Sequence, residues 1–153
     1  MRRPLLAALL CLSAGCETRN ESAAAAGPAI RRTGPAPRAT RGVVHTVRML
    51  MDNEGFRFEP SYLTVAEGDG IQFRMVSGVP HNVAFDDHFI PRGSRAQLVA
   101  NLSAIGSRDL AAPVVTVVDS SYVISTTGLA HGDYLFYCAP HRSLNMHGVL
   151  TVR

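Results

Sequence analysis

One short stretch near the carboxyl terminus, residues 137–148, limits what this chain can fold into more than any other feature. It places the thiol of Cys138, the imidazole of His141 and the thioether of Met146 within nine residues. Soft sulfur ligands together with imidazole favour copper over magnesium, calcium or manganese. One tight loop with the spacing C-x₂-H-x₄-M can present all three groups, but a His₂Cys site with a weak thioether needs a second histidine. The fold must therefore bring a distant segment to this loop, and His81 is the candidate.

These motifs resemble those of a known family. The pattern C-x-P-H-x₄-M-x-G near the carboxyl end, with His81-Asn82 far upstream, is similar to that of the plastocyanin-type cupredoxins. The resemblance implies an all-β, Greek-key β-sandwich that carries one type 1 copper ion, cycling between Cu(I) and Cu(II). It implies a one-electron carrier between redox partners, with no enzymatic activity of its own. The copper ligands that it implies are His81, Cys138, His141 and Met146.

Two further residues of the motif have supporting roles in the resembled family. Asn82 would hydrogen-bond across to the cysteine loop and hold the ligands in place even without metal. Pro140 would limit the backbone freedom of that loop. His147 is a rival to Met146 as axial ligand, and we favour Met146 because a shift by one residue would break the register of the loop. The alternatives to His81 as the remote ligand are His45, His88 and His131.

Other metals and other functions fit the sequence less well. Zinc is poorly served by a methionine ligand, and the region holds neither a second cysteine nor an H-E-x-x-H motif. A copper-dependent oxidase or reductase needs further histidine clusters, which the sequence lacks. A copper carrier that hands over its metal without a redox role would use the same ligands, so this alternative stays open.

From residue 43 onward, short β-branched and aromatic runs alternate with turn residues, as expected for a sandwich or barrel. The pattern predicts a set of about eight strands that make up a single cupredoxin domain, residues 43–153. The segments that we predict as strands are 43–50, 56–58, 62–65, 71–75, 81–85, 114–118, 122–125, 133–138 and 148–152.

One short helix is predicted in the 94–105 region, where the period-two pattern stops. Ser94 and Gln97 have the spacing of a capping box at a helix start. The apolar residues Leu98, Leu102 and Ile105 fall on one helical face.

The first 42 residues have the composition of a targeting segment and a tether. Residues 1–16 combine two arginines, a short apolar run and small residues before Cys16, which is typical of a signal peptide with a lipobox-like end. The apolar run is too short to span a bilayer. We expect lipid on Cys16 to hold the exported protein to a membrane, in the periplasm or at the cell surface. Residues 17–42, rich in Ala, Pro and Arg, are expected to form a disordered tether.

The charge and the cysteine content of the domain limit the kinds of partner and cross-link that we expect. All fifteen basic residues are arginine, and residues 43–153 hold eight of them against ten acidic residues, a net charge of −2. No block of arginines alternates with aromatic residues, so we expect no nucleic-acid binding. Cys138 is the only cysteine of the domain, which excludes a disulfide within it.

We expect a monomer that docks redox proteins weakly at an apolar surface near His141. That surface would include Val79, Pro80, Pro140 and Leu144.

Overall fold

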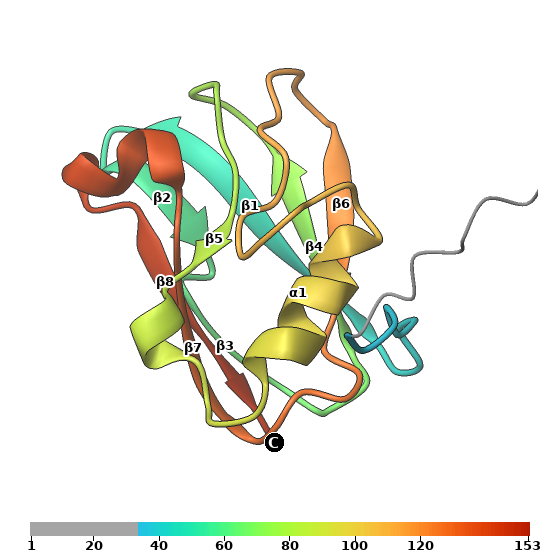
Figure 1. Ribbon diagram of the computed structural model, residues 1–153. Helices are drawn as coiled ribbons and strands as arrows, with labels where there is room; N and C mark the ends of the chain where they lie inside the picture. Colours follow the sequence, from blue (N-terminus) through green and yellow to red (C-terminus); the bar gives the residue numbers. More distant parts are fainter. Residues whose placement is uncertain (1–33) are drawn as a thin grey trace, which may run out of the picture. The chain divides into compact units, whose positions relative to one another are not determined.

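The computed structural model describes residues 34–153, which form a sandwich of two four-stranded β-sheets with one α-helix (Figure 1). One sheet has the strand order β2-β1-β4-β6, and the other has the order β3-β8-β7-β5. The predicted all-β sandwich of about eight strands with one short helix is confirmed. The strands are β1 (Val44–Asp52), β2 (Gly55–Glu59), β3 (Tyr62–Val65), β4 (Gly70–Met75), β5 (Ala84–Phe85), β6 (Ser121–Ser125), β7 (Gly132–Tyr137) and β8 (His147–Val152). The helices are η1 (Asp87–Phe89), α1 (Arg95–Ser103) and η2 (Ala139–Leu144).

The chain changes sheet repeatedly, and these changes bring distant segments together at one end. Strand β1 runs parallel to β4, and β3 runs parallel to β8. Parallel neighbours cannot be joined by a tight hairpin, so the connections between them pass through the other sheet. Because β5 pairs with the last residues of β7, the β4–β5 connection lies beside the β7–β8 connection. We call this end of the sandwich the η2 end, since helix η2 lies in the β7–β8 connection.

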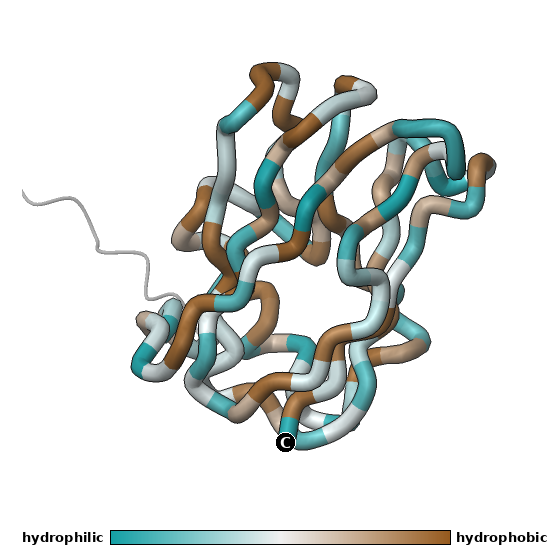
Figure 2. Tube along the Cα trace, turned by 180° about the vertical axis from the view of Figure 1, so that it is seen from behind, coloured by the Kyte–Doolittle hydropathy of each residue, from teal (hydrophilic) through white to brown (hydrophobic). Residues whose placement is uncertain are grey.

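The core forms where the inward residues of both sheets meet. Phe73 of β4 and Phe58 of β2 are each 1% exposed, and both pack against Phe136 of β7. The ring centroids lie 5.6 and 4.8 Å from that of Phe136, with the planes at 76° and 73°. Aromatic pairs favour such edge-to-face geometry. Figure 2 shows apolar and polar residues alternating along the strands, as a sandwich with one buried face per sheet requires.

Two of the strand predictions are wrong in extent. The strand predicted for residues 81–85 is reduced to β5, and residues 114–118 form no strand. The segments 81–85 and 114–118 are joined by a single isolated β-bridge, between His81 and Val115. β-Branched residues favour a strand where one face can be buried against neighbours. Residues 114–118 lack such cover, and Val117 is 67% exposed.

Helix α1 forms within the predicted region, but the predicted capping box is wrong. Ser94 precedes the helix without a side-chain cap. Its hydroxyl lies 2.7 Å from both the Ala130 amide and the Tyr134 hydroxyl, so tertiary partners occupy it. Gln97 likewise turns away from the helix start and donates to Asn101 Oδ1 at 2.8 Å. The apolar face behaves as predicted, with Leu98 and Leu102 fully buried and Ile105 packing beyond the helix end.

The last residues of the predicted tether, 34–42, pack against the sandwich. The Arg38 amide donates to the side chain of Asn101 at 2.9 Å, and the Thr127 hydroxyl donates to the Ala39 carbonyl at 2.7 Å. These bonds lie at the end of the sandwich where β1 begins, which we call the β1-start end. The signal peptide, Cys16 and the tether up to residue 33 lie outside the described residues. Within residues 34–153, no helix combines the length and apolar character needed to cross a membrane.

Candidate metal centre

The three groups of the carboxyl-terminal motif are presented by the β7–β8 connection. Cys138 follows the last residue of β7, His141 lies within η2, and Met146 directly precedes β8. The Cys138 amide donates to the Met146 carbonyl at 3.0 Å, and the Met146 amide donates to the His141 carbonyl at 3.3 Å. Asn145 closes the turn in the left-handed region with φ of 63°, a conformation that asparagine tolerates better than most residues. Backbone hydrogen bonds thus fix the loop by themselves.

His81 reaches the same point from the β4–β5 connection. Its Nδ1 lies 3.5 Å from Cys138 Sγ and 3.2 Å from His141 Nδ1, and the third side of this triangle, Cys138 Sγ to His141 Nδ1, is 3.4 Å. Imidazole nitrogens and thiolates bind Zn²⁺ at about 2.0 to 2.3 Å, and donors at such distances from one ion of this size lie about 3 to 4 Å apart. The triangle therefore has the dimensions of a metal site, and it is the one such His/Cys/Asp/Glu cluster within residues 34–153.

The orientation of the His81 ring suits metal binding. Its Nε2 lies 2.8 Å from the Ser77 carbonyl oxygen. A carbonyl oxygen can only accept, so Nε2 carries the ring proton, and Nδ1 turns a free lone pair towards Cys138. A backbone partner of this kind commonly fixes the tautomer of a metal-binding histidine.

Asn82 joins the two segments that form the site. Its Oδ1 accepts from the Ala139 amide at 2.8 Å, and its Nδ2 donates to the Ala112 carbonyl at 3.3 Å. The bond to Ala139 ties the residue after His81 to the residue after Cys138. Pro140, the next residue of that loop, lies in the first turn of η2. The cysteine loop and the remote histidine are thus held together by protein hydrogen bonds alone.

The site is closed to solvent and favours uncharged ligands when metal-free. His81, Cys138 and Met146 are 0% exposed, and His141 is 8% exposed. This burial raises the pKa of the Cys138 thiol and lowers the pKa of both imidazoles, because a charged form would lose its hydration. A cation is then needed to hold the thiolate, so metal binding releases a proton. Two neutral imidazoles, one thiolate and a nearby thioether are the donor set that suits copper.

The other histidines lie away from this cluster. His147, the rival to Met146, is in β8 opposite Tyr137 and has an exposed side chain, whereas Met146 is buried. His88 and His131 are exposed. His45 pairs instead with Asp69, with Nε2 2.8 Å from Oδ2.

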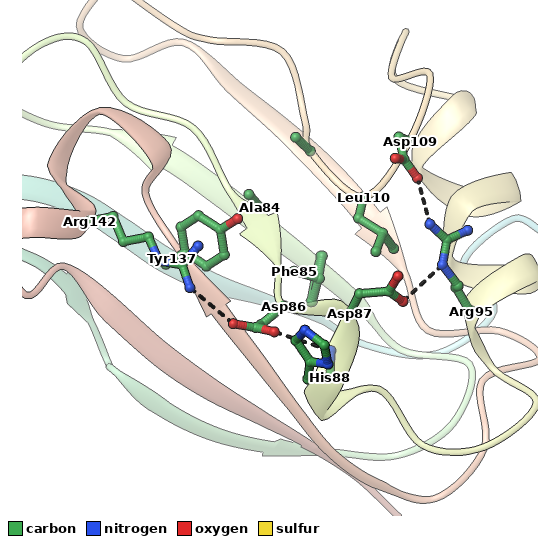
Figure 3. Close-up of a pocket in the computed structure, with 11 residues that line it drawn as sticks. Ala84, Phe85, Asp86, Asp87, His88, Arg95, Asp109, Leu110, Tyr137 and Arg142 are labelled. Atoms are coloured by element: carbon green, nitrogen blue, oxygen red, sulfur yellow. Dashed lines mark hydrogen bonds and ion pairs between the residues drawn. The ribbon is translucent and has the colours of Figure 1, made fainter.

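The sequence did not predict a group of arginine contacts beside the site. The Arg142 guanidinium lies 4.1 Å from the centroid of the Tyr137 ring and pairs with Asp86 at 3.2 Å (Figure 3). Next to it, Arg95 pairs with Asp87 at 2.8 Å and with Asp109 at 3.2 Å. The Arg142–Asp86 pair joins η2 to the residue after β5, and the Arg95 pairs join α1 to η1 and to residue 109. The sequence carries no local signal for the Arg142–Asp86 pair, because the two residues lie 56 positions apart.

Comparison with known proteins identifies the family. Residues 45–153 match the family model of copper binding proteins, plastocyanin/azurin family. Plastocyanin from Lactuca sativa is 38% identical over 98 residues, which are 64% of this chain and 89% of that protein. Plastocyanin from Prochlorothrix hollandica is 32% identical over 127 residues, 83% of each chain. The solved structure of oxidised plastocyanin from Dryopteris crassirhizoma has a TM-score of 0.52 and 30% identity, over 71% of this chain and all of that one.

The chain therefore belongs to the plastocyanin/azurin family of copper-binding proteins, and its fold is that of a cupredoxin. Within this family it is plastocyanin-like, a type 1 blue copper protein that binds one copper ion and carries electrons. The resemblance stated from the motifs is confirmed.

Proposed function

We propose that His81, Cys138, His141 and Met146 bind the copper ion, and that the protein carries single electrons between redox proteins outside the cytoplasmic membrane. The observation that carries this proposal is the triangle of Nδ1, Sγ and Nδ1 atoms, 3.2 to 3.5 Å on a side, formed by buried residues. Bound copper would supply the one-electron chemistry by alternating between Cu(II) and Cu(I). The alternative of a copper carrier without a redox role uses the same ligands.

The surroundings of the triangle favour an electron carrier over a metal carrier. Ser77 orients one imidazole, Asn82 ties the two segments, and the backbone bonds between Cys138 and Met146 close the loop. Ligands held in this way need little rearrangement when the charge at the site changes. The same burial leaves no room for a substrate, so we propose no catalysis by this site. A carrier that hands over its metal would need ligands that open readily.

We propose that electrons enter and leave at His141, which at 8% exposure is the least buried of the four proposed ligands. Val79 and Leu144 near it are 49% and 55% exposed, and Pro80 and Pro140 are also exposed. An apolar surface of this kind excludes water around the imidazole when a partner docks. A small contact area gives the weak binding that a shuttle requires, because the complex must dissociate after each transfer.

We also propose export by residues 1–16 and attachment to a membrane through lipid on Cys16. The support for this is the sequence of the leader. Mass spectrometry of the purified protein for acyl groups on Cys16 tests it, and a Cys16→Ser variant should appear in the soluble fraction. An unmodified Cys16 at the mature amino terminus would contradict lipid attachment.

Two measurements on the copper-loaded domain test the electron-carrier proposal. Absorption and electron paramagnetic resonance spectra should show the intense thiolate-to-copper band and narrow hyperfine splitting of a type 1 site. The electron self-exchange rate, measured by NMR line broadening, should be fast, and copper should remain bound in both oxidation states. Slow self-exchange with rapid transfer of copper to an added chelator would favour the metal carrier.

A further inference from the structure

Phe56 of β2 lies against both imidazoles of the site. Its ring is stacked on that of His141, with the centroids 3.8 Å apart and the planes at 16°. It meets His81 edge-on, with the centroids 6.0 Å apart and the planes at 67°. Within residues 34–153, no other phenylalanine or tyrosine ring stacks with a histidine.

The two imidazoles are held in different ways. His81 has the Ser77 carbonyl behind its ring, which fixes Nε2. His141 makes its side-chain hydrogen-bond contacts through Nδ1, to Cys138 and His81, and Nε2 has no partner within residues 34–153. The backbone of η2 fixes where the His141 ring begins but not the plane in which it lies. The Nδ1 contacts hold one edge of the ring, and the stacked ring of Phe56 restricts rotation of the plane about that edge.

The structure also fixes Phe56 itself. It pairs with Met51 across the β1–β2 ladder, which sets the side of the hairpin on which its ring lies. Gly78 of the β4–β5 connection, with φ of +73°, lies against the ring, and a Cβ there would come to 3.1 Å from Phe56 Cε1. A side chain at residue 78 would clash first with Met51 Cβ and would also press on the ring, so glycine here leaves space for both. The ring is thus wedged between the β4–β5 connection and η2.

We propose that Phe56 is a positioning residue for electron transfer, whose ring holds the plane of the His141 imidazole and shields one face of it from water. This inference rests on the proposed role of His141 as a ligand. Stacked aromatic pairs contribute enough free energy to change an equilibrium constant by about two- to tenfold. Loss of the ring therefore lets His141 sample other orientations in the metal-free protein. In the copper-loaded protein the ligand moves more on each transfer, which slows self-exchange.

A comparison of Phe56→Leu with Phe56→Tyr and Phe58→Leu tests this proposal. Phe56→Leu removes the ring and keeps an apolar side chain, and Phe56→Tyr restores the ring. Phe58→Leu is the matched control, since Phe58 lies on the same strand and packs on Phe73 and Phe136. In the metal-free protein, NMR should show the ring-current shift of the His141 ring protons lost in Phe56→Leu and kept in the other two. In the copper-loaded protein, Phe56→Leu should slow self-exchange by about two- to tenfold and shift the reduction potential.

The proposal is overturned if Phe56→Leu leaves the His141 signals and the self-exchange rate as in the parent. Equal changes in Phe56→Leu and Phe58→Leu would also overturn it, because they would show general loosening of the sandwich. The NMR readout needs no copper, so it reports on the stacking separately from the ligand assignment. A parent protein that bound copper without the intense absorption band would instead contradict the proposed function.

Discussion

The two ends of the sandwich differ in the partners of their buried polar groups. At the β1-start end, Asp69 accepts from the amides of Val43 and Ala66 and lies 2.8 Å from His45 Nε2. Asn101 there uses its amide oxygen and nitrogen in four hydrogen bonds. Each acceptor meets a donor, so this end is complete without a ligand.

At the η2 end, three atoms that commonly bind metals face one another instead. The Nδ1 atoms of His81 and His141 and the sulfur of Cys138 lie within 3.5 Å of each other. Burial disfavours the thiolate of Cys138, and a cation at the centre of the three atoms would stabilise it. The β1-start end thus pairs its polar atoms with protein donors, whereas the η2 end gathers the nitrogen and sulfur atoms that suit copper. Substitutions at the η2 end should therefore change copper binding, and those at the β1-start end should change stability.

The largest effect is expected for Cys138→Ser. Serine keeps the shape of the side chain but replaces the thiolate whose bond to copper produces the blue colour. The copper-loaded variant should lose the intense visible absorption, while circular dichroism still reports a folded β-sandwich. A variant that stayed blue would refute Cys138 as a ligand.

The same substitution at two buried asparagines compares the ends directly. Asn82→Ala leaves the Ala139 amide without its partner and should weaken copper binding by about ten- to a hundredfold, as loss of an orienting group commonly does. Asn101→Ala should leave copper affinity unchanged and lower the free energy of unfolding by about 1 to 3 kcal/mol. Copper competition titrations and urea denaturation of both variants provide the measurements. If both variants lost copper affinity equally, the two ends would not be independent.

Met146→Leu should alter the reduction potential and preserve binding. A weak axial thioether tunes the ion more than it holds it, so its replacement by an aliphatic side chain should raise the potential. Voltammetry of the copper-loaded variant measures the shift. His147→Ala is the control, because the His147 side chain is exposed. The reduction potential of this variant should equal that of the parent. An unchanged potential in Met146→Leu would point to another axial group.

The smallest effect is expected on acidification of the β1-start end. The hydrogen bond from His45, and those from the Val43 and Ala66 amides, hold the pKa of Asp69 below its ordinary value. A folded-state pKa below the unfolded value, which is about 3.9, gives stability that is present above pH 4 and lost as pH falls through the folded pKa. Metal-free Asp69→Asn should be less stable than the parent at neutral pH, with the difference shrinking below pH 4. Urea midpoints at several pH values test this, with the exposed Asp133→Asn as the control.

What could be predicted from the sequence was the part that depends on local order. Cys138, His141 and Met146 lie in one connection, so their spacing alone placed them near one another. The period-two pattern likewise predicted most strands, since alternation follows from the pleat of each strand. His81 was harder, because the chain offers four histidines upstream of the cysteine, at positions 45, 81, 88 and 131, and spacing does not choose among them. Asn82 distinguished it, through the resemblance and not through any local periodicity.

What only the tertiary structure decided were the contacts between distant segments. Ser94 has the spacing of a cap but bonds to Tyr134, and residues 34–42 have the composition of a tether but pack on the sandwich. The stacking of Phe56 on His141 joins a residue of β2 to a residue of η2, and neither local sequence predicts the contact. Local pattern reports the conformation that neighbours along the chain favour. Which side chains then touch is set by how the two sheets close, and that depends on the whole chain at once.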